Sequence, residues 1–152
     1  MIVEPLTDDE LAGRIDIEDR DDVALLVRSF YRYAAMDDLL GPIFFAAEMD
    51  WPFHLAKLTD FWTWQLFGER GYDGQPLRAH ESVNERTPFR DEHYDRWLEL
   101  FVATVDELFV GPTADAAKQR ATRMARALRK LINGEYAAGN KALVPQWTTP
   151  PR

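Results

Sequence analysis

The sequence predicts an all-α fold. Apolar residues recur at helical spacing through several long segments of the 152-residue chain, and no segment shows the alternation of a β-strand. Hydrophobic residues make up 46% of the chain, which is enough to cover one core, and aromatic residues make up 12%. Large rings in this number can line an apolar pocket as well as fill a core. We therefore expect a single helical domain.

Residues 1–20 form an acidic stretch with one glycine and scattered apolar residues, which is typical of an arm or a short helix before a core domain. The first amphipathic helix is predicted from Asp21 to Met36, where the apolar residues follow the helical period. These residues are Val23, Leu26, Val27, Phe30 and Ala34. Asp19, Asp21 and Asp22 favour a helix N-terminus, because negative charge interacts favourably with that end of the helix dipole.

A break and a pair of aromatic rings follow this helix. Residues 40–43, Leu-Gly-Pro-Ile, contain both strong helix breakers, so the first helix is expected to end before them. The sequence then places Phe44 and Phe45 in a turn rather than in a regular helix. Aromatic turns of this kind often cap a pocket.

A second helix is predicted to begin after Asp50, its expected N-cap, and to run to about Phe67. Pro52 falls in the first turn, where a helix tolerates a residue without an N–H donor. His54 falls on the apolar stripe of this helix, so its ring is expected to point inward. The stripe consists of Trp51, Leu55, Leu58, Phe61, Trp62 and Leu66.

A loop and a very short helix come next. Residues 68–76 contain three glycines, which disfavours regular structure. Pro76 then occupies a favoured position for a helix start, in the segment Pro-Leu-Arg-Ala-His. His80 is therefore expected to end a short helix that lies between two loops.

Two long helices complete the predicted domain, residues 21–134, and residues 135–152 form a tail. The first runs from around Arg90 to Gly111-Pro112, and its apolar residues are Tyr94, Trp97, Leu98, Phe101, Val105 and Leu108. Thr113 is the expected cap of the second, which ends at Asn133-Gly134. Its inward residues are Ala117, Ala121, Met124, Leu128 and Leu131, and its outward residues are Arg123, Arg126, Arg129 and Lys130.

Composition argues against several classes of function. A net charge of -8 and a pI near 4.9 disfavour nucleic acids and anionic membranes as partners, because both need concentrated Lys and Arg. The absence of cysteine excludes disulfides, thiolate catalysis and thiolate metal ligands, and leaves His, Tyr and carboxylates as strong ligands. The N-terminus lacks a signal-peptide pattern and no segment has the apolar length of a membrane span, so we expect a cytoplasmic protein.

The three histidines lie in different surroundings. His93 lies among charged residues at the start of a long helix, so it is expected to be a solvated surface residue. For His54 the spacing favours a core histidine that is hydrogen-bonded to a backbone group. His80, considered without other information, fits an exposed polar residue. Spacing alone therefore assigns no metal ligand.

Several short motifs, each weak alone, follow one another from about Val23 to Leu131. They are Phe30-Tyr31, Leu39-Leu40-Gly41-Pro42-Ile43-Phe44, Trp51 with His54-Leu55, Phe61-Trp62, Gly74-Gln75-Pro76 with His80, His93-Tyr94 and Arg96-Trp97-Leu98. In order, spacing and aromatic content this set resembles the truncated haemoglobins of group III. Group II members share a Gly-x-Pro before the proximal histidine and a Trp in the long helix, but the run from His93 to Leu98 fits group III better.

The resemblance implies a two-over-two helical sandwich with haem b between the helix that bears His54 and the short helix that bears His80. His80 matches the family's proximal ligand, whose imidazole binds the iron. Tyr31, His54 and Trp97 match the polar distal residues, each of which can donate a hydrogen bond to a diatomic ligand. For Trp97, a role as the core anchor of its helix fits equally well.

Three further residues are implied to contact the haem. Leu58 lies one turn after His54, so it is expected to pack over the haem and to limit access. Phe44 resembles the ring that stacks on the porphyrin edge, although Phe45 beside it is an alternative. Arg78, close to His80 in the sequence, is a candidate partner for a haem propionate.

These implications give one leading function and two alternatives. The leading function is reversible binding of O2, NO or CO at the His80-ligated iron. The first alternative is a haem redox enzyme that oxidises nitric oxide or turns over peroxide with an unidentified reductase, because a polar distal pocket suits that chemistry too. The second is a cofactor-free helical interaction module in which Trp51, Trp62 and Trp97 merely fill a core.

Overall fold

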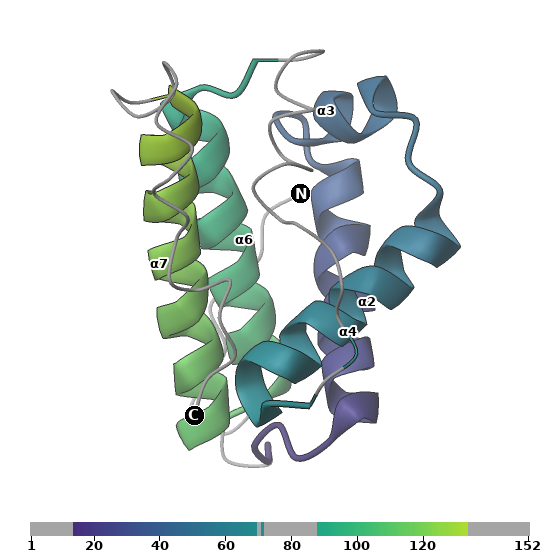
Figure 1. The fold of residues 1–152 in the computed structure, drawn as a ribbon, viewed down its shortest axis with the longest axis vertical. Helices are drawn as coiled ribbons and strands as arrows, with labels where there is room; N and C mark the ends of the chain where they lie inside the picture. Colours follow the sequence, from purple (N-terminus) through teal and green to yellow (C-terminus); the bar gives the residue numbers. More distant parts are fainter. Residues whose placement is uncertain (1–13, 70, 72–87, 134–152) are drawn as a thin grey trace.

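The computed structural model describes residues 14–69, 71 and 88–133, and all regular secondary structure in these ranges is α-helical (Figure 1). The helices are α2 (Arg20–Met36), α3 (Gly41–Ala46), α4 (Trp51–Phe67), α6 (Asp91–Leu108) and α7 (Pro112–Asn133). Helix α2 packs against α4 and α6, and α6 lies alongside α7. The predicted all-α class is confirmed. Within these ranges, no helix combines the length and the apolar character needed to cross a membrane.

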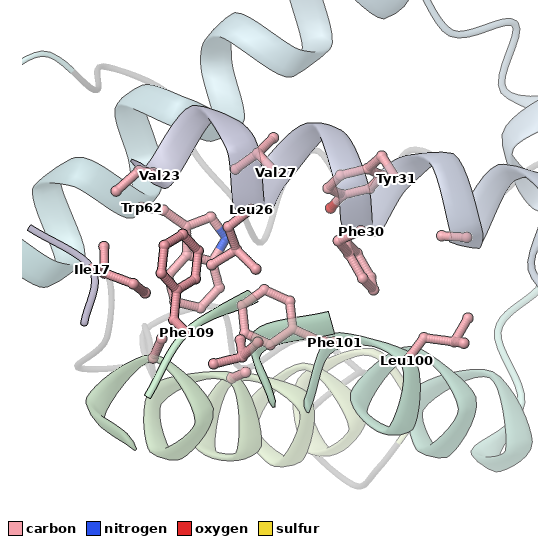
Figure 2. Packing of buried hydrophobic residues seen from close by; sticks show 14 of the residues in the cluster. Ile17, Val23, Leu26, Val27, Phe30, Tyr31, Trp62, Leu100, Phe101 and Phe109 are labelled. Carbon is pink, nitrogen blue, oxygen red and sulfur yellow. The ribbon is translucent and has the colours of Figure 1, made fainter. Parts of the chain in front are cut away.

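The predicted apolar stripe of α2 is buried. Val23, Leu26, Val27, Phe30 and Ala34 all face the core. Figure 2 shows part of this stripe packed between α2 and α6. The helix starts where the acidic residues predict, because the Asp19 side chain accepts a hydrogen bond from the Asp22 N–H at 3.0 Å.

The prediction that Phe44 and Phe45 lie in a turn is wrong, because both belong to the short helix α3. Pro42 suits the first turn of a helix, so the Gly-Pro pair that ends one helix also begins the next. A Cβ atom at Gly41 would lie only 2.8 Å from the carbonyl oxygen of Ala35, so only glycine allows this close turn. Phe44 is half-buried, whereas Phe45 is 88% exposed.

Both predicted ends of α4 are confirmed. The Asp50 side chain accepts a hydrogen bond from the Phe53 N–H at 3.4 Å. The helix ends after Phe67 at Gly68, which has a φ of 70° and therefore a left-handed conformation that suits glycine.

The N-terminus of α7 is capped by a residue from the other end of the chain. Thr113 is not the cap, because the helix already begins at Pro112. Instead, the Asp16 carboxylate accepts hydrogen bonds from the N–H groups of Thr113 at 2.9 Å and Ala114 at 2.8 Å. Gly111 makes this approach possible, because a Cβ there would lie 2.5 Å from Asp16 Cγ. The φ of Gly111, 144°, is also one that only glycine adopts readily.

The residues around Asp16 belong to the packed structure. Ile17 is 2% exposed and joins Val23, Leu26 and Phe109 in the core (Figure 2). The carbonyl oxygen of Ile15 accepts a hydrogen bond from the Val110 N–H at 3.1 Å. The last residues of the predicted arm therefore hold the start of α2 against the turn between α6 and α7.

Replacing Asp16 with Ala should lower the free energy of unfolding by about 1 kcal/mol at neutral pH, the usual effect of losing a helix cap. Burial alone would raise the Asp16 pKa, but hydrogen bonds from the N–H groups of Thr113, Ala114 and Ile17 lower it overall. The stabilisation is therefore complete above the ordinary carboxyl pKa and disappears as the pH falls through the lowered one. Urea denaturation at neutral and acidic pH measures this difference, with exposed Glu18→Ala as the control. A constant difference across that range would contradict the assignment.

Candidate functional site

Four aromatic side chains gather around one tyrosine, and the five rings come from four helices. This Tyr31 cluster consists of Tyr31, Phe44, Trp51, His54 and Trp97. The Tyr31 ring lies edge-on to the rings of His54 and Phe44, at centroid distances of 5.3 and 5.8 Å. Trp51 lies 5.5 Å from Phe44 and 5.7 Å from His54. Of the residues predicted for the site, the structure thus brings together the aromatic ones that lie in its described ranges.

The phenol of Tyr31 is held in its protonated form. The residue is only 9% exposed, and burial raises its pKa well above the ordinary value, while a hydrogen bond with the Trp97 side chain acts in the opposite direction. An indole can only donate, so the Trp97 N–H donates to the phenol oxygen of Tyr31. The phenol proton is therefore available for a further acceptor.

Trp97 connects the Tyr31 cluster to the core. Its ring lies edge-on to Phe30 at 5.5 Å and stacks on Phe101 at 5.3 Å with an interplanar angle of 12°. Phe101 in turn stacks on Trp62 at 4.8 Å. Trp97 is half-buried, so its indole both anchors α6 and reaches Tyr31.

His54 and Leu58 lie one turn apart on α4. The His54 ring packs against Tyr31 and Trp51, and its Nε2 atom is shielded from solvent. Leu58 is half-buried and packs against the core. His54 therefore places an imidazole beside a phenol on the inner side of α4.

His93 is not the solvated surface residue that its charged neighbours predict, because it is 8% exposed. Its backbone N–H donates to the Arg90 carbonyl oxygen at 2.9 Å, and the Arg90 N–H donates to His93 Nδ1 at 2.8 Å. This reciprocal cap turns the ring inward. The helical period could have indicated it, since Trp97 and Leu100 follow His93 at spacings of four and seven residues.

Burial lowers the pKa of His93, and the positive charge of Arg90 lowers it further. Nδ1 accepts a hydrogen bond, so the neutral ring carries its proton on Nε2. His93 is therefore a structural histidine in the arrangement that the structure shows.

Two of the residues predicted for the site, His80 and Arg78, lie outside the described residues. The described part of the site is the Tyr31 cluster on the inner side of α4. This cluster carries a phenol, an indole and an imidazole on aromatic surroundings, which is a donor set that fits the polar side of a haem pocket.

Comparisons with known proteins find two similar sequences and one similar structure. The group 3 truncated hemoglobin ctb of Campylobacter jejuni is 32% identical over 117 residues, which cover 74% of this chain and 90% of that protein. The group 1 truncated hemoglobin GlbN of Synechocystis sp. is 33% identical over 89 residues, 58% of this chain and 70% of that protein. The crystal structure of the group III truncated hemoglobin from Campylobacter jejuni superposes with a TM-score of 0.70 at 29% identity, covering 83% of this chain and 99% of that one. No protein-family model matches.

The His93→Gln variant should be less sensitive to acid than the wild type. Below the ordinary histidine pKa of about 6.5, the unfolded chain binds a proton that the buried ring resists, so the wild-type free energy of unfolding falls. Gln retains an acceptor for the Arg90 N–H but does not titrate. Urea denaturation between about pH 7 and about pH 5 tests this, and the other two histidines contribute equally to both proteins. Parallel pH profiles would mean that His93 is not buried in its neutral form.

Proposed function

Because this chain belongs to the group III truncated haemoglobins, we propose that it binds haem b through His80 and reversibly binds oxygen or another diatomic gas. The observation that carries the proposal is the buried Tyr31 phenol, which lies beside His54 and accepts a hydrogen bond from Trp97. Buried polar donors of this kind need an acceptor, and a gas ligand in the pocket provides one.

Haem, when bound, would supply an iron that can bind oxygen, nitric oxide or carbon monoxide. His80 holds this group in the proposal, as the resemblance implies. The two other histidines have different settings. His54 packs within the Tyr31 cluster, and His93 uses Nδ1 as an acceptor and so keeps the proton on Nε2, the nitrogen that a ligating imidazole commonly offers.

Tyr31 holds a proton on its phenol oxygen and presents it to the gas. Burial keeps the phenol protonated, and the Trp97 N–H occupies the oxygen from one side, which orients the hydroxyl. A ligand that carries partial negative charge, as oxygen would here, would accept the Tyr31 hydrogen bond more strongly than carbon monoxide would. We propose that the hydrogen bond from Tyr31 slows the release of oxygen.

The other side chains shape the pocket in this proposal. Leu58 lies one turn from His54 and limits access, and Phe44 meets Tyr31 edge-on at 5.8 Å and offers its ring to the porphyrin edge. Phe45, the alternative to Phe44, is exposed and has no comparable contact among the described residues. Arg78 remains the proposed partner of a haem propionate.

A haem redox enzyme is the second candidate, and the contact between Tyr31 and His54 favours it. Their rings lie 5.3 Å apart, so two proton-bearing groups of different acidity share one wall, as turnover of nitric oxide or peroxide would require. A slow oxygen dissociation without peroxide turnover supports the gas-binding function, and rapid peroxide turnover in the presence of a reductant supports the enzyme.

Replacing His80 with Ala should abolish histidine ligation of the iron, and with it most of the bound haem, because no cysteine is present to substitute. The visible absorption spectrum and the haem-to-protein ratio measure the effect. His93→Gln is the matched control and should retain the wild-type spectrum. A colourless wild-type protein would instead favour the cofactor-free interaction module, and a histidine-ligated spectrum in His80→Ala would exclude His80.

Replacing Tyr31 with Phe should speed the release of oxygen. The substitution removes only the hydroxyl, so packing changes little, and a hydrogen bond to a partly charged acceptor of about 1.5 to 3 kcal/mol corresponds to roughly a tenfold to hundredfold change. Stopped-flow oxygen dissociation and the carbon monoxide stretching frequency measure the loss. Because Trp97 can compensate, the Tyr31→Phe/Trp97→Phe double variant should show a larger effect. Unchanged values in both variants would make Tyr31 a core aromatic only.

A further inference from the structure

A buried carboxylate lies where α2 ends and the turn to α3 begins. Asp37 is 5% exposed, and its Oδ2 atom accepts hydrogen bonds from the N–H groups of Leu39 at 3.1 Å and Leu40 at 3.0 Å. Its backbone carbonyl oxygen accepts from the Gly41 N–H at 2.8 Å. Asp37 therefore shapes the turn that leads into α3.

The other carboxylate oxygen of Asp37 binds α6. Oδ1 accepts hydrogen bonds from Arg96 Nε at 2.8 Å and Nη2 at 2.7 Å. Burial alone would raise the Asp37 pKa, but the Arg96 guanidinium and the Leu40 and Leu39 N–H groups lower it overall. The charged, bonded form is therefore the one present at neutral pH.

This ion pair lies next to the elements that carry the Tyr31 cluster. Arg96 directly precedes Trp97 on α6. Asp37, the residue directly after α2, is six residues after Tyr31. The turn that Asp37 holds leads to Phe44 on α3, and Phe44 contacts Tyr31. One carboxylate thus connects the three helices that supply Tyr31, Phe44 and Trp97.

We propose that Asp37 and Arg96 are positioning residues for the distal wall, and that their ion pair fixes the place of Trp97 on α6 relative to Tyr31 on α2. A buried ion pair gains little net stability after the cost of desolvation, but its bonds require a defined placement of the two helices. The proposal concerns the arrangement of the wall, and only its gas-release readout rests on the proposed function.

The Asp37→Asn variant separates the two roles of the carboxylate. An amide oxygen can still accept from the Leu39 and Leu40 N–H groups, so the turn into α3 remains. The amide NH2 group then faces the Arg96 donors, and two donors cannot bond, so only the link to α6 is lost. Arg129→Gln is the matched control, because it removes the ion pair of Arg129 with Asp91, at 3.0 Å, which also joins two helices but is exposed.

The experiment uses the full-length protein with its haem, and records the Trp97 indole N–H resonance, the carbon monoxide stretching frequency and the rate of oxygen dissociation. In Asp37→Asn we expect the indole resonance to move toward that of a free N–H, and oxygen to dissociate about two- to thirtyfold faster. Haem content and helicity should stay at the wild-type level, as in Arg129→Gln. The Asp37→Asn/Arg96→Gln double variant, whose two amides can bond to each other, should recover part of both effects.

Each other outcome decides against one proposal. If all three readouts of Asp37→Asn match the wild type, or if Arg129→Gln changes them equally, the positioning role is wrong. If Asp37→Asn does not fold, Arg96→Gln tests the same link and should show the same indole shift, and an unshifted resonance there also overturns it. If the wild type binds no haem, the proposed function fails, while the indole resonance still tests the link between Asp37 and Arg96.

Discussion

Helix α2 packs against both α4 and α6, so two neighbouring residues of α2 contact different helices. Phe30 faces α6, where it lies 5.5 Å from Trp97 and 5.3 Å from Phe101. Tyr31 turns toward α4, where it lies 5.3 Å from His54. Successive residues of a helix are about 100° apart, so one helix can contribute to the core with one side chain and to the Tyr31 cluster with the next. The Tyr31 cluster therefore includes a residue of a helix that the core already holds in place.

Among the described residues, buried polar groups differ in where their hydrogen-bond partners lie. Thr59, Thr63 and Thr104 each donate to the carbonyl oxygen four residues earlier, at 2.8, 2.6 and 2.7 Å. These bonds stay within one helix and place no demand on its neighbours. Tyr31 and Asp37 instead find their side-chain partners on α6. A hydrogen bond to a partner on another helix forms only when the two helices are correctly placed. The bonds of Tyr31 and Asp37 therefore depend on the arrangement of the helices, whereas those of the threonines do not.

The long helices could be predicted from the sequence because their signals are local. Stripe spacing and caps such as Asp50 lie within a few residues of the helix that they define. The wrong predictions had different causes, and one of them depended on a distant partner. Thr113 looked like a cap, but the chain supplies Asp16 from 97 residues away. His93 has charged neighbours in the sequence, yet its surroundings in space come from the inner face of α6. Phe44 lies in a helix whose start needs the close turn at Gly41.

The residues of the site were the hardest to predict from pattern alone, for a different physical reason. Tyr31 directly follows Phe30 of the periodic stripe of α2 and, although it is also buried, it contacts His54 on α4. The helical period identifies residues that other helices cover, but it does not identify residues whose position is set by a bound group. His80 carries no periodic signal at all, and only the order of motifs shared with a family selected it. In the proposed function His80 binds haem, and a residue whose contacts come from a cofactor does not need to follow the packing pattern of a helix.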